Sequence, residues 1–272
     1  MASMIGSKVE RKEDKKFLTG KGRYTADITL HNQSYAVFIR SPHARAKIKG
    51  IDTAKAKKAS GVIDVLTGKD LADDKIGGLI AGWKIVSKDG TDMKCPAHPA
   101  LATDTVNYVG DHVALVIAES LQEAKDAADL VNVDYKVLKA VANTGDAMNA
   151  EAIHDGIDKN LCFDWELGDK AKVDEAFSSA DKVVEMDIVN NRLVPNAMEP
   201  RASIGDYNSS SDELTLYTTS QNPHLSRLVM SAFNALHPEH KFRIVAPDVG
   251  GGFGSKIYPY SEDVVIAWAA KR

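Results

Sequence analysis

Runs of apolar residues between positions 35 and 135 predict a domain in which strands and helices interleave. The continuous apolar run 113–118 is the clearest buried strand, and a helical pattern over 121–131 follows it. Ser120 stands at the N-cap of that helix with Glu123 three residues later, which is the arrangement of a capping box. Shorter runs predict strands at 35–40, 48–51, 62–66 and 131–135, and an Ala- and Lys-rich helix at 53–60. This order of elements indicates an α+β or α/β domain.

The second half of the chain has fewer elements, separated by longer irregular stretches. Residues 67–105 are interpreted as a surface excursion of the first domain, and the turn-rich residues 136–160 as a linker. Residues 182–189 alternate between polar and apolar positions and predict an edge or hairpin strand. The remaining patterns predict strands at 214–218 and 242–246 and helices at 174–177, 224–236 and 262–270.

The length and net charge of the chain limit the classes of protein to which it could belong. The 272 residues are enough for two domains, and a hydrophobic content of 44% is enough to fill their cores. The net charge is −4, and the basic residues near the N-terminus are interrupted by acidic ones, so nucleic-acid binding is not expected. No apolar run is long enough to span a membrane, and no secretion signal precedes the domain, so we expect a cytoplasmic protein.

The two cysteines, Cys95 and Cys162, lie far apart in the sequence. They have no C-x-x-C partner, so this chain's cysteines alone cannot build an iron–sulfur cluster or a structural zinc site.

A glycine-rich run is the most informative local feature. Four glycines fall within positions 250–254, around Phe253, after an apolar strand and before a helix. Such a loop lets backbone N–H groups approach an anionic ligand closely, with a helix N-terminus behind it. It fits neither a Walker A loop nor a complete G-x-G-x-x-G fingerprint, because Ser255 stands where the third glycine belongs. A cofactor cradle is favoured, and a sharp turn without a ligand is the alternative.

Two other segments carry candidate chemistry. Gln221 follows the strand 214–218 and could present its amide to a ligand, while Ser220 and Asn222 could equally serve only to cap the next helix. Glu199 and Arg201 flank Pro200, and they could form a buried ion pair or act in catalysis; the structural role is favoured.

Taken together, these segments resemble the molybdopterin-binding large subunit of the xanthine dehydrogenase, aldehyde oxidase and aerobic carbon monoxide dehydrogenase family. The resemblance extends from about residue 9 to 272 and rests on five motifs in the family's order. They are Thr19–Asp27, Arg40–Ala46, Met198–Ala202, Ser220–His224 and Gly250–Gly254.

The resemblance implies a mixed α+β fold. An N-terminal hammerhead α/β domain would span 18–135, and the first part of a molybdopterin-binding domain would span 145–272. It also implies that Gln221 hydrogen-bonds an oxo ligand of the molybdenum. Four loop residues would pack beside the cofactor and offer it backbone donors, and they are Gly251, Gly252, Phe253 and Gly254.

The family's chemistry oxidises a small carbon substrate with oxygen from water at a molybdenum–molybdopterin centre, here expected in the cytosine dinucleotide form. The resemblance places the iron–sulfur clusters and FAD on partner subunits. It places the catalytic glutamate, and many pterin contacts, in a C-terminal half that is missing from these 272 residues and would have to be supplied by the rest of the subunit or by another chain. No catalytic residue and no metal ligand is therefore assigned to these 272 residues.

Two further expectations follow. Purine and aldehyde hydroxylases of the family commonly carry a glutamate after the lysine of the glycine loop, whereas Ile257 stands there in this chain. An apolar residue at that position resembles the carbon monoxide dehydrogenase branch and argues against a purine substrate. The alternative to an enzyme part is a non-catalytic remnant or scaffold that binds partner chains.

Overall fold

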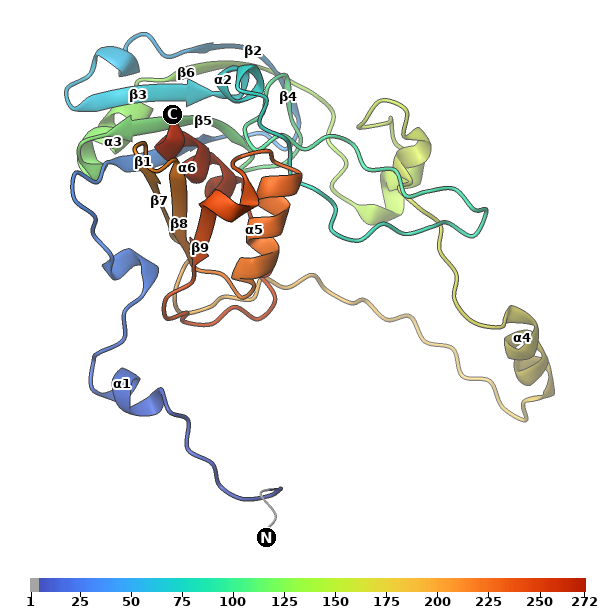
Figure 1. Cartoon of the computed structure of the whole chain (residues 1–272). Coiled ribbons are helices and arrows are strands. Elements are labelled where there is room, and N and C mark those ends of the chain that lie inside the picture. The colour runs from blue at the N-terminus through green and yellow to red at the C-terminus, as the bar shows by residue number, and fades with distance from the viewer. Residues whose placement is uncertain (1–4) are drawn as a thin grey trace.

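The structure, a computed structural model, describes residues 5–272 and contains three sheets of three strands each (Figure 1). The first two sheets come from the first half of the chain and the third from the second half. Their strands are β1 (Tyr35–Arg40), β2 (Ala46–Asp52), β3 (Val62–Thr67), β4 (Thr105–Val106), β5 (His112–Ala118), β6 (Asn132–Val137), β7 (Ser203–Asn208), β8 (Glu213–Thr218) and β9 (Phe242–Val245). The helices are α1 (Asp14–Leu18), α2 (Gly68–Asp73), α3 (Leu121–Ala128), α4 (Lys170–Ser179), α5 (Pro223–Ala232) and α6 (Ser261–Lys271).

The first sheet is built around β5, which lies between β1 and β3 and is antiparallel to both. β5 is almost entirely buried, as its continuous apolar run predicts. α3 packs beside this sheet and begins at Ser120, whose hydroxyl accepts a hydrogen bond from the Glu123 N–H. The predicted N-cap is therefore confirmed, and the Glu123 carboxylate accepts from the Ser120 hydroxyl at 2.7 Å and not from the Ser120 backbone.

The topology of the third sheet brings two segments of the chain to one edge. β8 pairs with β9 in parallel, and α5 connects the two strands. Residues 219–222 follow the carboxyl end of β8, and the glycine-rich residues 250–254 come after the same end of β9. Because the carboxyl ends of adjacent parallel strands face the same way, both polar segments leave the sheet at the same edge.

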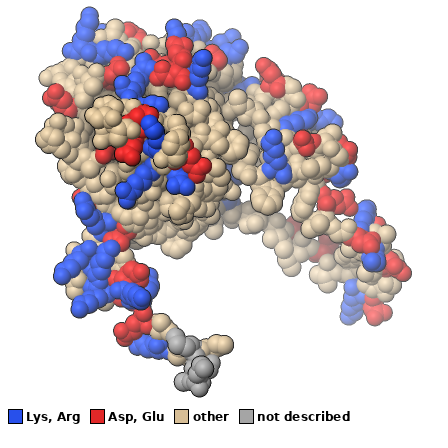
Figure 2. Space-filling model, in the orientation of Figure 1, with Lys and Arg blue, Asp and Glu red and all other residues tan. Residues whose placement is uncertain are grey.

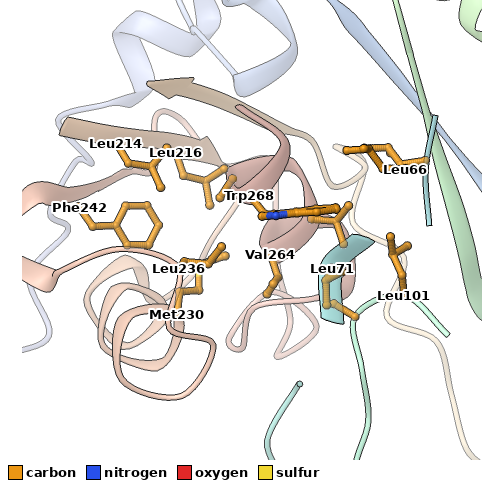
Figure 3. Close-up of a cluster of buried hydrophobic side chains, with 14 residues drawn as sticks. Leu66, Leu71, Leu101, Leu214, Leu216, Met230, Leu236, Phe242, Val264 and Trp268 are labelled. Carbon is orange, nitrogen blue, oxygen red and sulfur yellow. The ribbon is translucent and has the colours of Figure 1, made fainter. Parts of the chain in front are cut away.

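One of the three hydrophobic clusters among the described residues joins the two halves of the chain (Figure 3). Leu66, Leu71 and Leu101 come from the first half, and they lie in one buried cluster with Val264 and Trp268 of α6. A hydrogen bond also joins the two halves: the Trp268 indole N–H donates to the Asp74 carboxylate at 2.8 Å. The two halves therefore share the interior that stabilises them.

Three predictions about elements are corrected. Residues 53–60 form only a single 3₁₀ turn, Ala56–Lys58, because Ala56 is its one buried residue and offers too little apolar surface to hold a longer helix. Residues 182–189 form no strand, because no neighbouring strand among the described residues provides hydrogen-bond partners. The stretch 67–105 contains the short helix α2, in which Asp70 accepts hydrogen bonds from the backbone and hydroxyl of Thr67.

The remaining turns are short 3₁₀ helices at Thr25–Asp27, Thr144–Asn149, Asp158–Asn160 and Glu239–Lys241. Among the described residues, none of the helices combines the length and the apolar character needed to cross a bilayer.

Candidate cofactor site

Gln221 is locked to the glycine-rich loop by both its backbone and its side chain. Its N–H donates to the Lys256 carbonyl at 2.8 Å, and its Oε1 accepts from the N–H groups of Gly254 at 3.0 Å and Lys256 at 3.2 Å. These two bonds fix the orientation of the amide, because only its oxygen can accept them. The Nε2 group is left as a donor with no partner among the described residues, and the residue is exposed.

The neighbours of Gln221 fold the turn that presents it. Ser220 Oγ accepts from the Asn222 N–H at 3.0 Å, and Asn222 Oδ1 caps α5 by accepting from the Leu225 N–H. Pro223 at the first helical position fits this cap. Ser220 and Asn222 thus have the capping role that the sequence allowed, whereas Gln221 takes no part in the cap.

The glycines are required where other chain segments approach the loop. A Cβ on Gly252 would lie 2.4 Å from the Gln221 Cδ, and one on Gly250 would lie 2.5 Å from the Glu199 Cβ. Gly251 and Gly254 have φ of +98° and +90°, values that side-chain-bearing residues rarely adopt. The loop therefore keeps its shape only with glycine at these positions.

The crest of the loop carries unpaired donors. Within residues 5–272, the backbone N–H groups of Gly251, Gly252 and Phe253 make no hydrogen bond, while the Ser255 N–H bonds back to the Gly252 carbonyl. Phe253 has a φ of 51° and a 74% exposed side chain, so its ring lies on the surface. Three free N–H groups beside the Gln221 amide form a cluster of neutral donors suited to an anion or to oxo groups.

A buried ion pair supports the loop from below. The Lys256 Nζ donates to the Glu199 carbonyl at 2.8 Å and lies 3.5 Å from the Glu199 Oε2, which itself accepts from the Gly250 N–H at 2.6 Å. Lys256 is only 3% exposed. The Glu199 Oε1 is buried and makes no hydrogen bond to the described residues. The pairing of Glu199 with Lys256 is absent from the sequence prediction, which considered Glu199 only together with Arg201.

Arg201 instead joins a second network at the start of α6. Its guanidinium lies 3.7 Å from the centre of the Tyr260 ring and 3.2 Å from Glu262. Arg40, from β1 in the other half of the chain, donates to the same carboxylate at 2.7 Å. The two residues that flank Pro200 therefore form separate ion pairs with different partners.

Glu262 lies among charged neighbours that favour its ionised form. Burial alone would raise its pKa, but the approach of His112, the Arg40 hydrogen bond and the Arg201 charge outweigh burial and hold the pKa far below its ordinary value. The His112 Nε2 lies 3.2 Å from the Glu262 Oε1 without the alignment of a hydrogen bond. The network ties the first half of the chain to the helix that follows the glycine loop.

The structure thus brings Gln221 into contact with Gly252 and Gly254, places Gly251 beside the Phe253 ring, and leaves that ring exposed. Three large hollows, of about 560, 750 and 420 Å³, are lined by other residues, and the hollow beside Ser220 and Lys256 measures only about 10 Å³. No group of three or more His, Cys, Asp or Glu within residues 5–272 is placed to hold a metal ion. The loop and Gln221 are therefore an open edge of donors and not a closed pocket.

Two family models match the chain in sequence. The hammerhead domain of aldehyde oxidase and xanthine dehydrogenase matches residues 19–139, and the molybdopterin cofactor-binding domain matches residues 153–272.

Individual relatives agree with these matches. The nicotine 6-hydroxylase large subunit of Paenarthrobacter nicotinovorans is 35% identical over 99% of this chain and 32% of its own length. The carbon monoxide dehydrogenase large chain of Afipia carboxidovorans is 36% identical over 94% of this chain and 32% of its own. Quinoline 2-oxidoreductase from Pseudomonas putida 86 superimposes with a TM-score of 0.84 at 32% identity, over 98% of this chain and 33% of that one.

The hammerhead fold and the adjoining cofactor-binding fold define a class of molybdopterin-binding subunits. The chain belongs to the xanthine dehydrogenase, aldehyde oxidase and carbon monoxide dehydrogenase family of such large subunits. It spans about a third of the length of the curated relatives that it matches.

Proposed function

We propose that this chain supplies the glycine loop and Gln221 to the cofactor site of a molybdenum hydroxylase that oxidises a small carbon substrate. The observation that supports this most directly is the fixed amide of Gln221. Its oxygen is held by two backbone donors, which leaves its Nε2 group as a donor without a partner among the described residues, on the side chain that contacts the glycine loop.

This set of residues fits the proposed cofactor. A molybdenum–molybdopterin centre supplies, when bound, a two-electron redox change and oxygen derived from water. Its oxo ligands and phosphate groups are hydrogen-bond acceptors, which match the donors of Gln221, Gly252 and Phe253. Lys256 and Glu199 would hold the loop in position, and neither would need to touch the metal.

The proposal extends to partner chains. Cys95 and Cys162 are both exposed and unpaired and cannot alone hold an iron–sulfur cluster, and we propose that the clusters, together with FAD, are carried by separate subunits that receive the electrons. The cofactor would be the cytosine dinucleotide form, and the catalytic glutamate would come from the part of the large subunit to which this chain does not correspond. Ile257 favours a small, non-purine substrate, since no carboxylate is present there to bind a ring nitrogen.

Replacing Gln221 by Ala in the purified, cofactor-loaded assembly tests the proposed role. We expect kcat to fall about tenfold or more, because one preorganised donor to the reacting centre is lost. The molybdenum content should change little, and the thermal unfolding temperature should fall only as far as the lost bonds to the Gly254 and Lys256 N–H groups require. Gln122→Ala on the surface of α3 is the matched control and should leave kcat unchanged. Equal kcat in both variants would contradict the role.

A scaffold without catalysis is the second candidate function, and the open edge of the site favours it. If no other polypeptide completes that edge, the donors of the loop would face solvent and hold no cofactor. The molybdenum content of the natively purified chain distinguishes the two functions.

A further inference from the structure

Residues 165–198, which we call the arm, extend away from the rest of the molecule and carry α4 (Figure 1). Every residue from 161 to 196 is exposed. α4 has no buried residue, and its Val173 and Phe177, one turn apart, are 50% and 59% exposed. An arm of this length without packing of its own is unusual in a folded domain, because its ordering must be stabilised by contacts elsewhere.

The second part of the arm has the side-chain pattern of a half-buried strand. Val184, Met186 and Ile188 fall on one face of an extended chain and are 84%, 73% and 78% exposed. Glu185 and Asp187 fall on the opposite face between Val183 and Val189, and neither makes an ion pair within residues 5–272. The alternation that predicts a strand at 182–189 is thus present in the fold without a second strand beside it.

The backbone of this segment is also unpaired. Within the described part of the chain, no hydrogen bond involves the N–H or C=O groups of residues 181–198. An extended backbone with free donors and acceptors and one apolar face is what β-augmentation requires. Further exposed apolar side chains continue the surface toward the glycine loop, and they are Val189, Leu193, Val194 and Met198.

We propose that residues 182–189 add as a strand to a sheet in the portion of the large subunit that this chain does not span. The proposal rests on the function proposed above. The chain spans about a third of its relatives' length, so a polypeptide of about twice its size would complete the subunit. That polypeptide is the occupant that fits, because burying the apolar face of the arm needs a sheet edge above a hydrophobic interior.

The location of the arm ties this docking to the cofactor site. The arm ends at Met198, and the next residue, Glu199, binds the Gly250 N–H and Lys256 beneath the glycine loop. A polypeptide that pairs with residues 182–189 and continues along residues 190–198 would reach the open edge formed by Gln221 and the loop. The same contact would bring the missing side of the site into place.

The test measures amide hydrogen exchange across residues 182–189. Exchange is measured in two samples. One is the chain alone, and the other is the assembly that also contains the rest of the large subunit from the same host, either as a separate polypeptide or as a continuation of the chain. We expect exchange in this segment to slow by about tenfold or more in the assembly. Met186→Asp should abolish that protection and Asp187→Asn should retain it, because only Met186 lies on the apolar face. Both sites are exposed, so neither change should unfold the chain.

Three results would overturn the proposal. In the first, amide exchange in residues 182–189 stays fast in the assembly. In the second, the host has no polypeptide that corresponds to the rest of the subunit. In the third, the segment becomes protected in the chain alone as the chain's concentration rises. The last result would identify a second copy as the occupant. Molybdenum is measured on the same samples: metal with an unprotected arm refutes only the docking, whereas a protected arm without metal refutes only the proposed function.

Discussion

At the scale of single residues, the site is shaped by the absence of side chains as much as by their presence. Gly252 leaves room for Gln221, and Gly250 leaves room for Glu199. The sequence could predict the loop and Gln221 because both belong to local motifs. It could not predict that Glu199 would meet Lys256, since 57 residues separate them and only the fold of the third sheet brings them together.

Replacing Gly252 by Ala should disturb the site more than its size suggests. The new Cβ would overlap the side chain of Gln221, which must rotate away and give up its bonds to Gly254 and Lys256. We expect a loss of about 1–3 kcal/mol in the free energy of unfolding, measured by urea denaturation. Gly50→Ala is the control, because a Cβ there meets nothing within 4 Å. Equal stability of the two variants would refute the packing that we describe.

At the scale of elements, α6 is fixed at its start by charges from both halves of the chain. Glu262 in its first turn binds Arg40 and Arg201. The hydrophobic pattern alone predicts α6, α3 and β5, because each has a strongly apolar face or run. It overestimates the length of the helix at 53–60, which has little apolar surface to pack. It also predicts a strand at 182–189, but a strand there needs a neighbouring strand that the described residues do not provide. It misses α2, which is too short to show a period.

The stability that Glu262 contributes should depend on pH with a definite sign. Its pKa is lowered in the folded state, so as the pH falls the Glu262 carboxylate binds a proton in the unfolded chain before it does so in the folded chain. The contribution is fully present above the ordinary pKa of 4.5 and is lost progressively as the pH falls below that value.

Urea unfolding of the chain and of Glu262→Gln at neutral pH and below pH 4.5 measures this effect. The variant should be less stable at neutral pH, and the difference should shrink in acid. The exposed ion-pair residue Glu239, replaced by Gln, is the control and should show a much smaller difference at neutral pH. A difference for Glu262→Gln that grows in acid would contradict the network.

At the scale of the whole molecule, the hammerhead domain and the cofactor-binding domain are joined by a common core. Leu71 and Leu101 of the first half lie in the same buried cluster as Leu216, Val264 and Trp268 of the second (Figure 3). On the face shown in Figure 2, Lys and Arg are interspersed with Asp and Glu over this body, with no continuous surface of one sign. The sequence divides the chain into two domains but cannot show that their interiors merge, because the contacts join residues more than 100 positions apart.

The shared core predicts one cooperative unfolding transition. Leu71→Ala should lower the free energy of unfolding by about 2–5 kcal/mol. It should shift far-ultraviolet circular dichroism and tryptophan fluorescence together, although Trp268 lies in the other half. Ile63→Ala removes a 58% exposed side chain from β3 and should shift both signals far less. Two separate transitions, or a shift in only one signal, would show that the domains unfold independently.

Whether this chain contributes to a molybdenum site is measured by the molybdenum content of the chain purified in its native assembly from its own host. We expect close to one molybdenum atom per chain, because the donors of Gln221 and the glycine loop would be completed by the rest of the subunit. An assembly that contains no molybdenum would contradict it and would leave the chain as a scaffold with an unfilled cofactor edge.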